Sequence, residues 1–329
     1  MREPAFWWRR PSLASHLLAP IAAAYGAVVA RRMMRSGARA GLPVLCVGNF
    51  TLGGAGKTPT VIALAKMLTD AGERVFCLSR GYGGSAVGPK LVDVQTDSAA
   101  QVGDEALLLA RAAPTIIAHD RVAGAALAKQ HGASLVILDD GLQNASLAKN
   151  LTIAVIDGRR GIGNACVFPA GPLRAPLAAQ IKRADALLVI GGNNDPAVAA
   201  IARDLPIFHG RLAPDTTAAG ALHGRKVLAF AGIGDPEKFF ATALDAGIAV
   251  AARTTFPDHH RYSGEEAANL VMRAEHDGLA LLTTEKDHAR MTGEPLLAAL
   301  AARAHVLPVT LVVNEMDALR ALIRKKTGR

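Results

Sequence analysis

Aromatic residues are scarce in this chain of 329 residues, where Phe, Trp and Tyr together make up 4%. Half of the residues are nevertheless hydrophobic, so we expect a large interior built mainly from aliphatic side chains. The sequence lacks an aromatic-interleaved basic groove and any known nucleic-acid motif, which argues against a nucleic-acid partner. It also lacks internal repeats and low-complexity tracts, apart from an enrichment in alanine. The length fits two domains of ordinary size.

Cysteine is almost absent, with Cys46, Cys77 and Cys166 as the three examples. Their number is odd, they are widely separated, and two of them lie in apolar runs typical of strands. We therefore expect reduced thiols, as in a cytosolic protein. The pattern excludes a disulfide framework and a cysteine metal site.

Acidic residues are outnumbered by Lys and Arg, 28 to 37, which gives a net charge of +9. This balance favours an anionic partner, either a membrane surface or a phosphorylated substrate. Positive charge is densest in residues 1–40, where arginines flank an uncharged stretch over residues 12–30. These arginines are Arg2, Arg9, Arg10, Arg31, Arg32, Arg35 and Arg39.

The uncharged stretch follows Trp7 and Trp8. A transmembrane helix needs about 20 strongly apolar residues, whereas this stretch is rich in Ala and contains Ser, His, Pro and Gly. A cleaved secretory signal is disfavoured because arginines lie between the apolar run and the cleavage-like residues 38–40. We predict a helix lying in the membrane interface, with the tryptophans at headgroup depth and the arginines on anionic phosphates. The alternative is a helix packed on the protein's own core.

A glycine-rich turn follows the apolar run 44–47 and leads into Lys57 and Thr58. The N–H groups of such a turn suit a polyphosphate, while the lysine reaches the outer phosphates and the threonine ligates Mg²⁺. Thr51 stands where the first glycine of G-x-x-x-x-G-K-[ST] is expected, so an ordinary turn with a surface lysine is the alternative. The preceding strand and the following helical pattern favour nucleotide binding. The predicted contacts are Thr51, Leu52, Gly53, Gly54, Ala55, Gly56, Lys57 and Thr58.

Apolar runs without alternating polarity, separated by helical patterns, predict a mostly parallel sheet covered by helices, the α/β fold of phosphate-loop (P-loop) NTPases. The expected strands are 74–79, 91–94, 115–117, 135–138, 151–156 and 186–190, and the helices are 58–71, one opened by residues 103–105, and 121–130.

Two aspartates, Asp139 and Asp140, end one of these strands. The carboxyl edge of a parallel sheet is also where the phosphate loop lies, so Asp139 is placed like a Walker B aspartate that holds Mg²⁺. The alternative is an ordinary turn. A turn explains one aspartate better than two, because adjacent like charges are costly without a cation.

Asp104 and Glu105 open a helix, where a carboxylate caps the N-terminus and interacts favourably with the helix dipole. Capping needs only one of them. The second could assist metal ligation or accept a proton from an attacking hydroxyl. Arg174 is the one charge of the Pro-rich loop 168–176, which makes it either an anion-binding residue or an inert, solvated one.

Residues from about 205 to 224 lack a regular pattern and are interpreted as an inter-domain connection. The remainder predicts a smaller α/β unit with strands 226–231 and 280–283 and helices 264–277 and 315–325. His259 and His260 lie in its loop 256–262. We exclude zinc because adjacent residues do not share a helix face and no third ligand has suitable spacing. The predicted division is a membrane-associated, amphipathic segment over 1–40, a P-loop domain over 41–205, and a smaller C-terminal domain over 206–329, with the last boundary between 205 and 225.

A set of segments along nearly the whole chain closely resembles the tetraacyldisaccharide 4'-kinases, the lipid A 4'-kinases of Gram-negative bacteria. In chain order these segments are VGNFTLGGAGKTP, SRGYGG, VGDEALLLA, ILDDGLQN, FPAGPLRAP, AGIGDPEKFF, FPDHHRY and TTEKD. Several of them are not shared with other P-loop proteins.

The resemblance implies ATP-dependent phosphorylation of the 4'-hydroxyl of the lipid A disaccharide 1-phosphate by a monomer at the cytoplasmic face of the inner membrane. By the family pattern, Asp104 would be the catalytic base and His259 would support it. The Mg²⁺ ligands would be Thr58, Glu105, Asp139 and Asp140. The substrate contacts would be Arg174 and Gln143.

Three positions depart from the family pattern. Asn144 stands in place of the usual His, Ala175 in place of Glu, and Asp235 in place of Asn. Two other functions were weighed. A membrane-positioning ATPase switch would carry a second lysine where this chain has Leu52, and a small-molecule P-loop kinase or ligase would not need residues 1–40.

Overall fold

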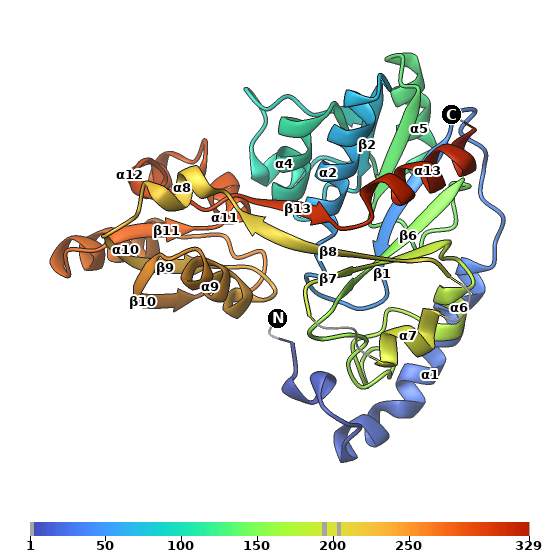
Figure 1. Ribbon diagram of the computed structural model, residues 1–329, viewed down its shortest axis with the longest axis horizontal. Coiled ribbons are helices and arrows are strands. Elements are labelled where there is room, and N and C mark those ends of the chain that lie inside the picture. The colour runs from blue at the N-terminus through green and yellow to red at the C-terminus, as the bar shows by residue number, and fades with distance from the viewer. Residues whose placement is uncertain (1–2, 193–195, 203–204, 329) are drawn as a thin grey trace.

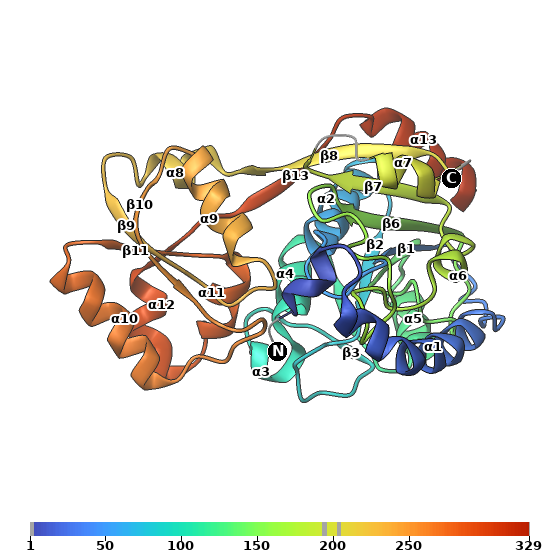
Figure 2. The ribbon, with the colours of Figure 1, turned by 90° about the horizontal axis from the view of Figure 1, so that it is seen from below.

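The computed structural model describes residues 3–192, 196–202 and 205–328. These residues form two units that lie side by side, each built on its own β-sheet (Figure 1). The larger unit has a sheet of nine strands and the smaller unit a sheet of four. Two neighbouring strands of the larger sheet connect the units: β8 runs toward the smaller unit and carries the chain into it, and β13 carries it back (Figures 1 and 2).

The larger sheet is parallel except at its two edges, where β13 pairs with β8 and β3 pairs with β4 in antiparallel fashion. In spatial order its strands are β13 (Val309–Val313), β8 (Ile207–Pro214), β7 (Ala186–Ile190), β6 (Leu151–Asp157), β1 (Val44–Asn49), β5 (Leu135–Asp139), β2 (Val75–Ser79), β4 (Thr115–Ile117) and β3 (Lys90–Leu91). Every residue of the six strands from β7 to β4 in this order is buried. The predicted mostly parallel sheet, covered on both faces, is confirmed.

Helices cover the two faces of this sheet because successive strand residues point in opposite directions. Leu45 and Val47 of β1 pack with one set of helices, and Val44 and Cys46 pack on the other side. The first set is α2 (Lys57–Asp70), α4 (Asp104–Ala112) and α13 (Met316–Thr327). The other face is covered by α5 (Arg121–Gln130), α6 (Leu177–Ile181) and α7 (Pro196–Ala202), while the short α3 (Ala99–Val102) adjoins α4.

The smaller unit is a four-stranded parallel sheet with its own apolar core. Its strands, in spatial order, are β10 (Ala249–Thr255), β9 (Lys226–Ala231), β11 (Ala280–Thr283) and β12 (Ala304–Val306). Its helices are α8 (Thr216–Gly220), α9 (Pro236–Asp245), α10 (Gly264–His276), α11 (Glu285–Met291), the 3₁₀ turn η2 (Pro295–Leu297) and α12 (Ala298–Arg303). The predicted second α/β unit is therefore confirmed.

The segment 205–224 differs from its prediction as a patternless connection, since it contains β8 and α8. β8 escaped detection because its burial alternates and its antiparallel partner, β13, lies far along the chain. Strand pairing places β8, β13 and α13 with the larger sheet, whereas the sequence assigned 206–329 to the second domain. We propose that the smaller unit spans about 215–308 and is inserted between β8 and β13.

The N-terminal segment consists of a 3₁₀ turn, η1 (Ala5–Trp8), and α1 (Leu13–Met33), which lies along the larger unit (Figure 2). α1 buries only a narrow strip, Ser15, Ala22, Gly26 and Met33. A Cβ at Gly26 would lie 3.3 Å from the ring of Pro176, so the contact is close. By length and composition this 21-residue helix is able to cross a membrane.

The predicted placement of Trp7 at headgroup depth is wrong, while that of Trp8, which is partly exposed, stays a prediction. Trp7 is buried, donates from Nε1 to the carbonyl of Pro169 (3.1 Å) and packs edge-on against Phe168. Trp8 donates from Nε1 to Glu3 and lies under the guanidinium of Arg160. Both amphipathic rings are therefore engaged by the protein itself. Arg2 lies outside the described residues.

Replacing Leu319 of α13 by Ala should lower the free energy of unfolding of the larger unit by about 2 to 5 kcal/mol, because the side chain is fully buried in the core. Both tryptophans of the chain, Trp7 and Trp8, contact the larger unit, so tryptophan fluorescence during denaturant unfolding reports on it. The control is Leu296→Ala, an exposed leucine of the smaller unit. Equal, small decreases in the free energy of unfolding for the two variants would contradict the assignment of α13 to the larger unit.

Candidate functional site

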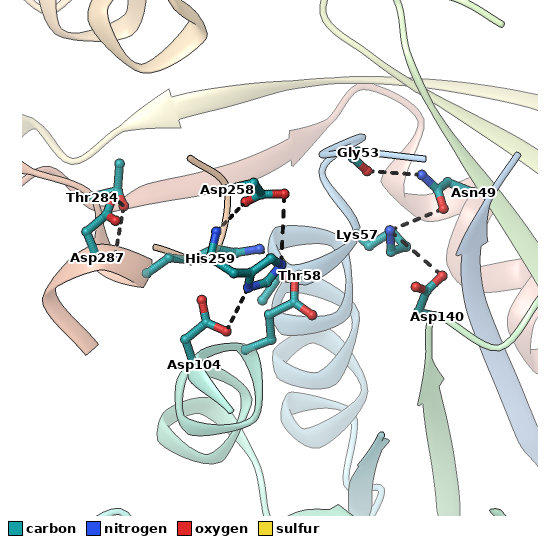
Figure 3. A network of polar contacts seen from close by, with 12 residues as sticks. Asn49, Gly53, Lys57, Thr58, Asp104, Asp140, Asp258, His259, Thr284 and Asp287 are labelled. Carbon is teal, nitrogen blue, oxygen red and sulfur yellow. Dashed lines mark hydrogen bonds and ion pairs between the residues drawn. The ribbon is translucent and has the colours of Figure 1, made fainter. Parts of the chain in front are cut away.

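The loop between β1 and α2 forms one wall of the site. Gly53 and Gly56 have φ of 92° and 95°, a left-handed conformation that suits glycine. Asn49, buried at the end of β1, donates from Nδ2 to the carbonyl of Thr51 (2.7 Å) and accepts from Lys57 Nζ (3.1 Å). Asn49 thus stabilises the loop conformation and orients the Lys57 side chain (Figure 3). The sequence did not reveal this role.

Two cationic side chains, Arg174 and Lys57, contact or approach Asp140. Arg174 donates from one terminal nitrogen to both carboxylate oxygens, at 3.0 and 2.8 Å, and Lys57 Nζ lies 3.8 Å away. Burial alone would raise the pKa of Asp140, but the charges of Lys57 and Arg174 hold it at about 2. Arg174 also donates from Nε to the carbonyl of Thr51 (2.9 Å), so it ties the strand end to the phosphate loop.

Asp139 forms no ion pair within the described residues, and the more distant charges of Lys57 and Lys286 only partly offset its burial. It is buried at the end of β5, and its Oδ1 has no hydrogen-bond partner among the described residues. Burial, with the nearby charges of Glu105 and Asp140, raises the pKa of this carboxyl to about 7. A buried, unpartnered carboxylate oxygen is costly, and a bound cation would remove that cost.

Asp104, at the start of α4, is nearly buried and is paired with the smaller unit. Arg290 of α11 donates from Nε and from a terminal nitrogen to Oδ2, at 2.8 and 2.5 Å, and His259 Nδ1 lies 3.4 Å from Oδ1. Burial opposes ionisation, but the His259 contact and the charge of Arg290 lower the pKa of Asp104. The capping explanation is not supported, because Gly103 is the N-cap residue and the Asp104 side chain makes no capping bond.

Glu105 lies between the phosphate loop and α11. Its Oε1 accepts from Thr58 Oγ1 (3.4 Å) and from Lys286 Nζ (2.6 Å). Burial would raise the pKa of Glu105, but the charge of Lys286 lowers it. The adjacent residues of α4 are therefore both contacted by cations of α11, since Lys286 and Arg290 are one helical turn apart.

His259 enters the site from the loop before α10, with a left-handed backbone (φ 55°) and a partly exposed ring. Figure 3 shows it pointing toward Asp104. Burial lowers the pKa of His259, but the contact with Asp104 outweighs it and raises the pKa overall. His260 is directed elsewhere, stacked on Phe256 and bonded to Glu266.

Several of these groups line one cavity of about 1050 Å³ between the two units, while Asp104 is buried beside His259 and does not line it. Its wall includes the loop residues 52–58, the carboxylates Asp139 and Asp140, and Arg174 and Gln143. The smaller unit adds His259 and Lys286, and α1 adds Tyr25, Val29 and Arg32. Among the described residues, no three His, Cys, Asp or Glu side chains are close enough to hold a metal ion by themselves.

Other predicted positions have mainly structural contacts. Gln143 donates from Nε2 to the carbonyl of Asn49 and to the side chain of Gln180, at 2.8 and 2.7 Å. Ala175 is fully buried. Asp235 caps α9 and pairs with Arg159 (2.9 Å).

Asn144 accepts from the backbone and hydroxyl of Ser146. The sequence assigned no role to Lys286 or Arg290, although Lys286 belongs to the recognised segment TTEKD. Lys286 and Arg290 are four residues apart, and this spacing is the sequence signal that could have placed both on one helix face.

Comparison with known proteins gives a consistent result. A family model described as tetraacyldisaccharide-1-P 4'-kinase matches residues 14–328. Proteins named tetraacyldisaccharide 4'-kinase are 53% identical in Rhodopseudomonas palustris (strain BisB5), over 100% of this chain and 98% of the relative, and 54% identical in Methylobacterium sp. (strain 4-46), over 100% of both. A crystal structure of LpxK from Aquifex aeolicus, described as an apo form in complex with ATP, superposes with a TM-score of 0.72 at 26% identity, over 96% of this chain and 100% of that chain.

Asp139→Asn should stabilise the protein in buffer free of nucleotide and divalent cations at pH 8. Because the folded pKa of about 7 exceeds the reference value of 3.8, the folded state binds this proton more tightly than the unfolded state. The wild type therefore loses stability as the pH rises from about 4 to 7, a loss of the order of a few kcal/mol that the Asn variant avoids.

Melting temperatures measured from pH 4.5 to 8 test this prediction. The control is Asp120→Asn, at an exposed N-cap where Asn serves as well as Asp. An Asp139→Asn protein that melts no higher than wild type at pH 8 would contradict the uncompensated charge.

Proposed function

This chain belongs to the tetraacyldisaccharide-1-phosphate 4'-kinase family, and we propose that the cavity between its two units is where the family's reaction occurs. The protein is an ATP-dependent kinase of lipid A biosynthesis, and its acceptor is the 4'-hydroxyl of the tetraacyldisaccharide 1-phosphate. The observation that carries the proposed site is the meeting of Thr58, Glu105 and His259 in one cavity, with the buried Asp104 in contact with His259. The family match over 14–328 disfavours a positioning ATPase or a small-molecule kinase.

ATP binds with its phosphates against residues 51–58. The backbone N–H groups at the start of α2 and the ammonium of Lys57 provide positive potential there. Burial lowers the pKa of Lys57, while the neighbouring charge of Asp140 favours its protonated form. Asn49 and Asp140 hold this side chain beside the loop, where it reaches the outer phosphates.

Mg²⁺ fits the oxygen donors that remain. Thr58 and Glu105 are adjacent, and Asp139 offers an unpartnered oxygen. Asp140 is the fourth predicted ligand, although it is already paired with Arg174. Mg²⁺ commonly takes one or two carboxylates and completes its shell with water and phosphate oxygens, so a cage made of protein alone is not required. When bound, the ion would neutralise charge on the β- and γ-phosphates.

Asp104 accepts the proton of the 4'-hydroxyl. Arg290 occupies its Oδ2, which leaves Oδ1 beside His259, a residue that lines the cavity. The lowered pKa of Asp104 keeps it ionised and able to receive a hydrogen bond from the sugar. His259 fixes the orientation of the carboxylate and shares the charge that develops, so the two act as one unit.

The substrate enters from the side of α1. Tyr25, Val29, Arg32 and Arg35 of this region line the same cavity as the phosphate loop. An arginine pair beside an apolar helix suits a molecule with a phosphate and acyl chains. Gln143 and Arg174 line the same cavity and would be further substrate contacts. The exposed side chains of α1 would lie in the interface of the cytoplasmic face of the inner membrane, and the kinase would act as a monomer.

Asp104→Asn should reduce the rate of phosphate transfer by about 10² to 10⁴-fold, as for a lost general base. The assay compares transfer from ATP to purified disaccharide 1-phosphate with plain ATP hydrolysis. The variant should also melt lower than wild type because Arg290 loses a partner, so rates are measured well below its transition.

The double variant Asp104→Asn, His259→Ala should transfer phosphate faster than expected from multiplying the fold reductions in rate of the two single variants. A folded Asp104→Asn enzyme with wild-type turnover would exclude Asp104 as the base.

Leu17→Asp combined with Ile21→Asp should weaken binding to anionic vesicles. The two side chains are 72% and 60% exposed on α1, so the fold should persist. Burial of each in lipid contributes about 1.5 to 3 kcal/mol, and its loss should reduce binding by about tenfold or more. The control is Leu296→Asp on the smaller unit. Wild-type binding should also fall with salt, and release by detergent alone would indicate a spanning helix.

A further inference from the structure

Helix α11 of the smaller unit brings a cation to the place where the phosphate loop and α4 meet. Lys286 Nζ lies 2.6 Å from Glu105 Oε1, the same oxygen that accepts Thr58 Oγ1 at 3.4 Å. Thr58 is the loop residue expected to ligate the Mg²⁺ that accompanies the ATP phosphates. The ammonium of Lys286 is thus one shared oxygen away from the site of phosphoryl transfer, although it belongs to a different unit.

The two cations of α11 differ in how firmly they are held. Arg290 is 6% exposed and is fixed by Asp104, by Asp287 (2.8 Å) and by the carbonyl of Gly232 (2.6 Å). Lys286 is 27% exposed and lines the cavity, and within the described part of the chain its one hydrogen-bond acceptor is Glu105. Arg290 is therefore an anchor between the units, whereas Lys286 is free to exchange one anionic partner for another.

We propose that Lys286 is a catalytic residue whose ammonium donates to the γ-phosphoryl oxygens of ATP during transfer. This inference rests on the proposed function and on the placement of ATP phosphates against residues 51–58. When Glu105 and Thr58 turn to the metal and the nucleotide, Lys286 loses the acceptor Glu105 while anionic phosphoryl oxygens arrive beside it. Exchange of one anion for the other keeps the partly buried ammonium paired.

The chemical step balances without consuming Lys286. A bond forms between the 4'-oxygen and the γ-phosphorus, the bond from that phosphorus to the β,γ-bridging oxygen breaks, and its electron pair leaves with ADP. The hydroxyl proton passes to Asp104. Lys286 keeps its proton and places its positive charge beside the phosphoryl group during transfer, as a positioned cation does in other phosphoryl-transfer enzymes.

Two variants test this role, Lys286→Met, which keeps most of the aliphatic stem, and Lys286→Arg, which keeps the charge. The control is Lys226→Ala, an exposed lysine of the same unit. Lys286→Met should lower kcat by about 10² to 10³-fold with the KM for ATP nearly unchanged, because the contact acts mainly in the transition state. Lys286→Arg should recover part of the rate, and Lys226→Ala should match wild type.

Nucleotide binding gives a readout independent of turnover. Lys286→Met should bind Mg²⁺-ADP as wild type does, but should lose most of the extra affinity for Mg²⁺-ADP with aluminium fluoride, which imitates the phosphoryl group in transfer. Unchanged kcat and unchanged analogue affinity would overturn the proposal. Equal losses for ADP and for the analogue would also overturn it, because they indicate a structural role.

The wild type and Lys226→Ala separate this inference from the function on which it rests. If neither transfers phosphate to the disaccharide, the proposed site fails as a whole. If both do so and Lys286→Met matches them, only the role of Lys286 is lost.

Discussion

Negative charge is concentrated at one edge of the larger sheet, and the arrangement of the molecule depends on how that charge is offset. Asp139 and Asp140 end β5, and Glu105 is close enough to raise the pKa of Asp139. Carboxylates in a partly buried site repel one another strongly unless cations or hydrogen bonds compensate them. The chain supplies cations from three separate places, the start of α2, the Pro-rich loop and α11. Within the described part of the chain Asp139 Oδ1 has no hydrogen-bond partner, and this deficit is what makes the edge receptive to a further cation.

The same electrostatics explains why the smaller unit lies against the larger one. Arg290 and Lys286 would each leave an uncompensated carboxylate on α4 if the units separated. A second contact at the opposite side of the cavity joins Lys238 of α9 to Asp157 at the end of β6 (2.9 Å). Isolated buried ion pairs contribute little net stability, so these contacts mainly fix how the units are positioned. Docking of the smaller unit and assembly of the proposed catalytic groups are consequently one event.

The sequence predicted the fold well where structure is local. Continuous apolar runs identified the central parallel strands, and the glycine-rich turn marked the phosphate loop, because strand, turn and helix start follow within a few residues. It predicted which acidic residues lie at the strand and helix ends, and the structure brings Asp139 and His259 to one cavity, with Asp104 in contact with His259. Their catalytic and metal-binding roles stay predictions.

The sequence did less well where a residue's surroundings come from distant parts of the chain. Lys286 and Arg290 contact residues more than 180 positions away, and nothing local shows that α11 meets α4. β8 is defined by pairing with β13 across the inserted unit. Trp7 fits a membrane interface and a protein interior equally well, since its ring is amphipathic, and only tertiary packing decides between them.

The insertion of the smaller unit has a consequence for biosynthesis. Leu319 and Ile323 of α13 share a core with Leu45 and Val47 of β1, so the earliest strand of the sheet is covered by a helix that leaves the ribosome after the whole inserted unit. Until α13 is synthesised, the larger unit exposes the apolar face that α13 covers in the complete fold. Domains tend to fold as they emerge, but this one cannot close its core until synthesis reaches α13. The nascent chain therefore presents a long-lived hydrophobic surface of the kind that chaperones bind, while the inserted unit is already able to fold.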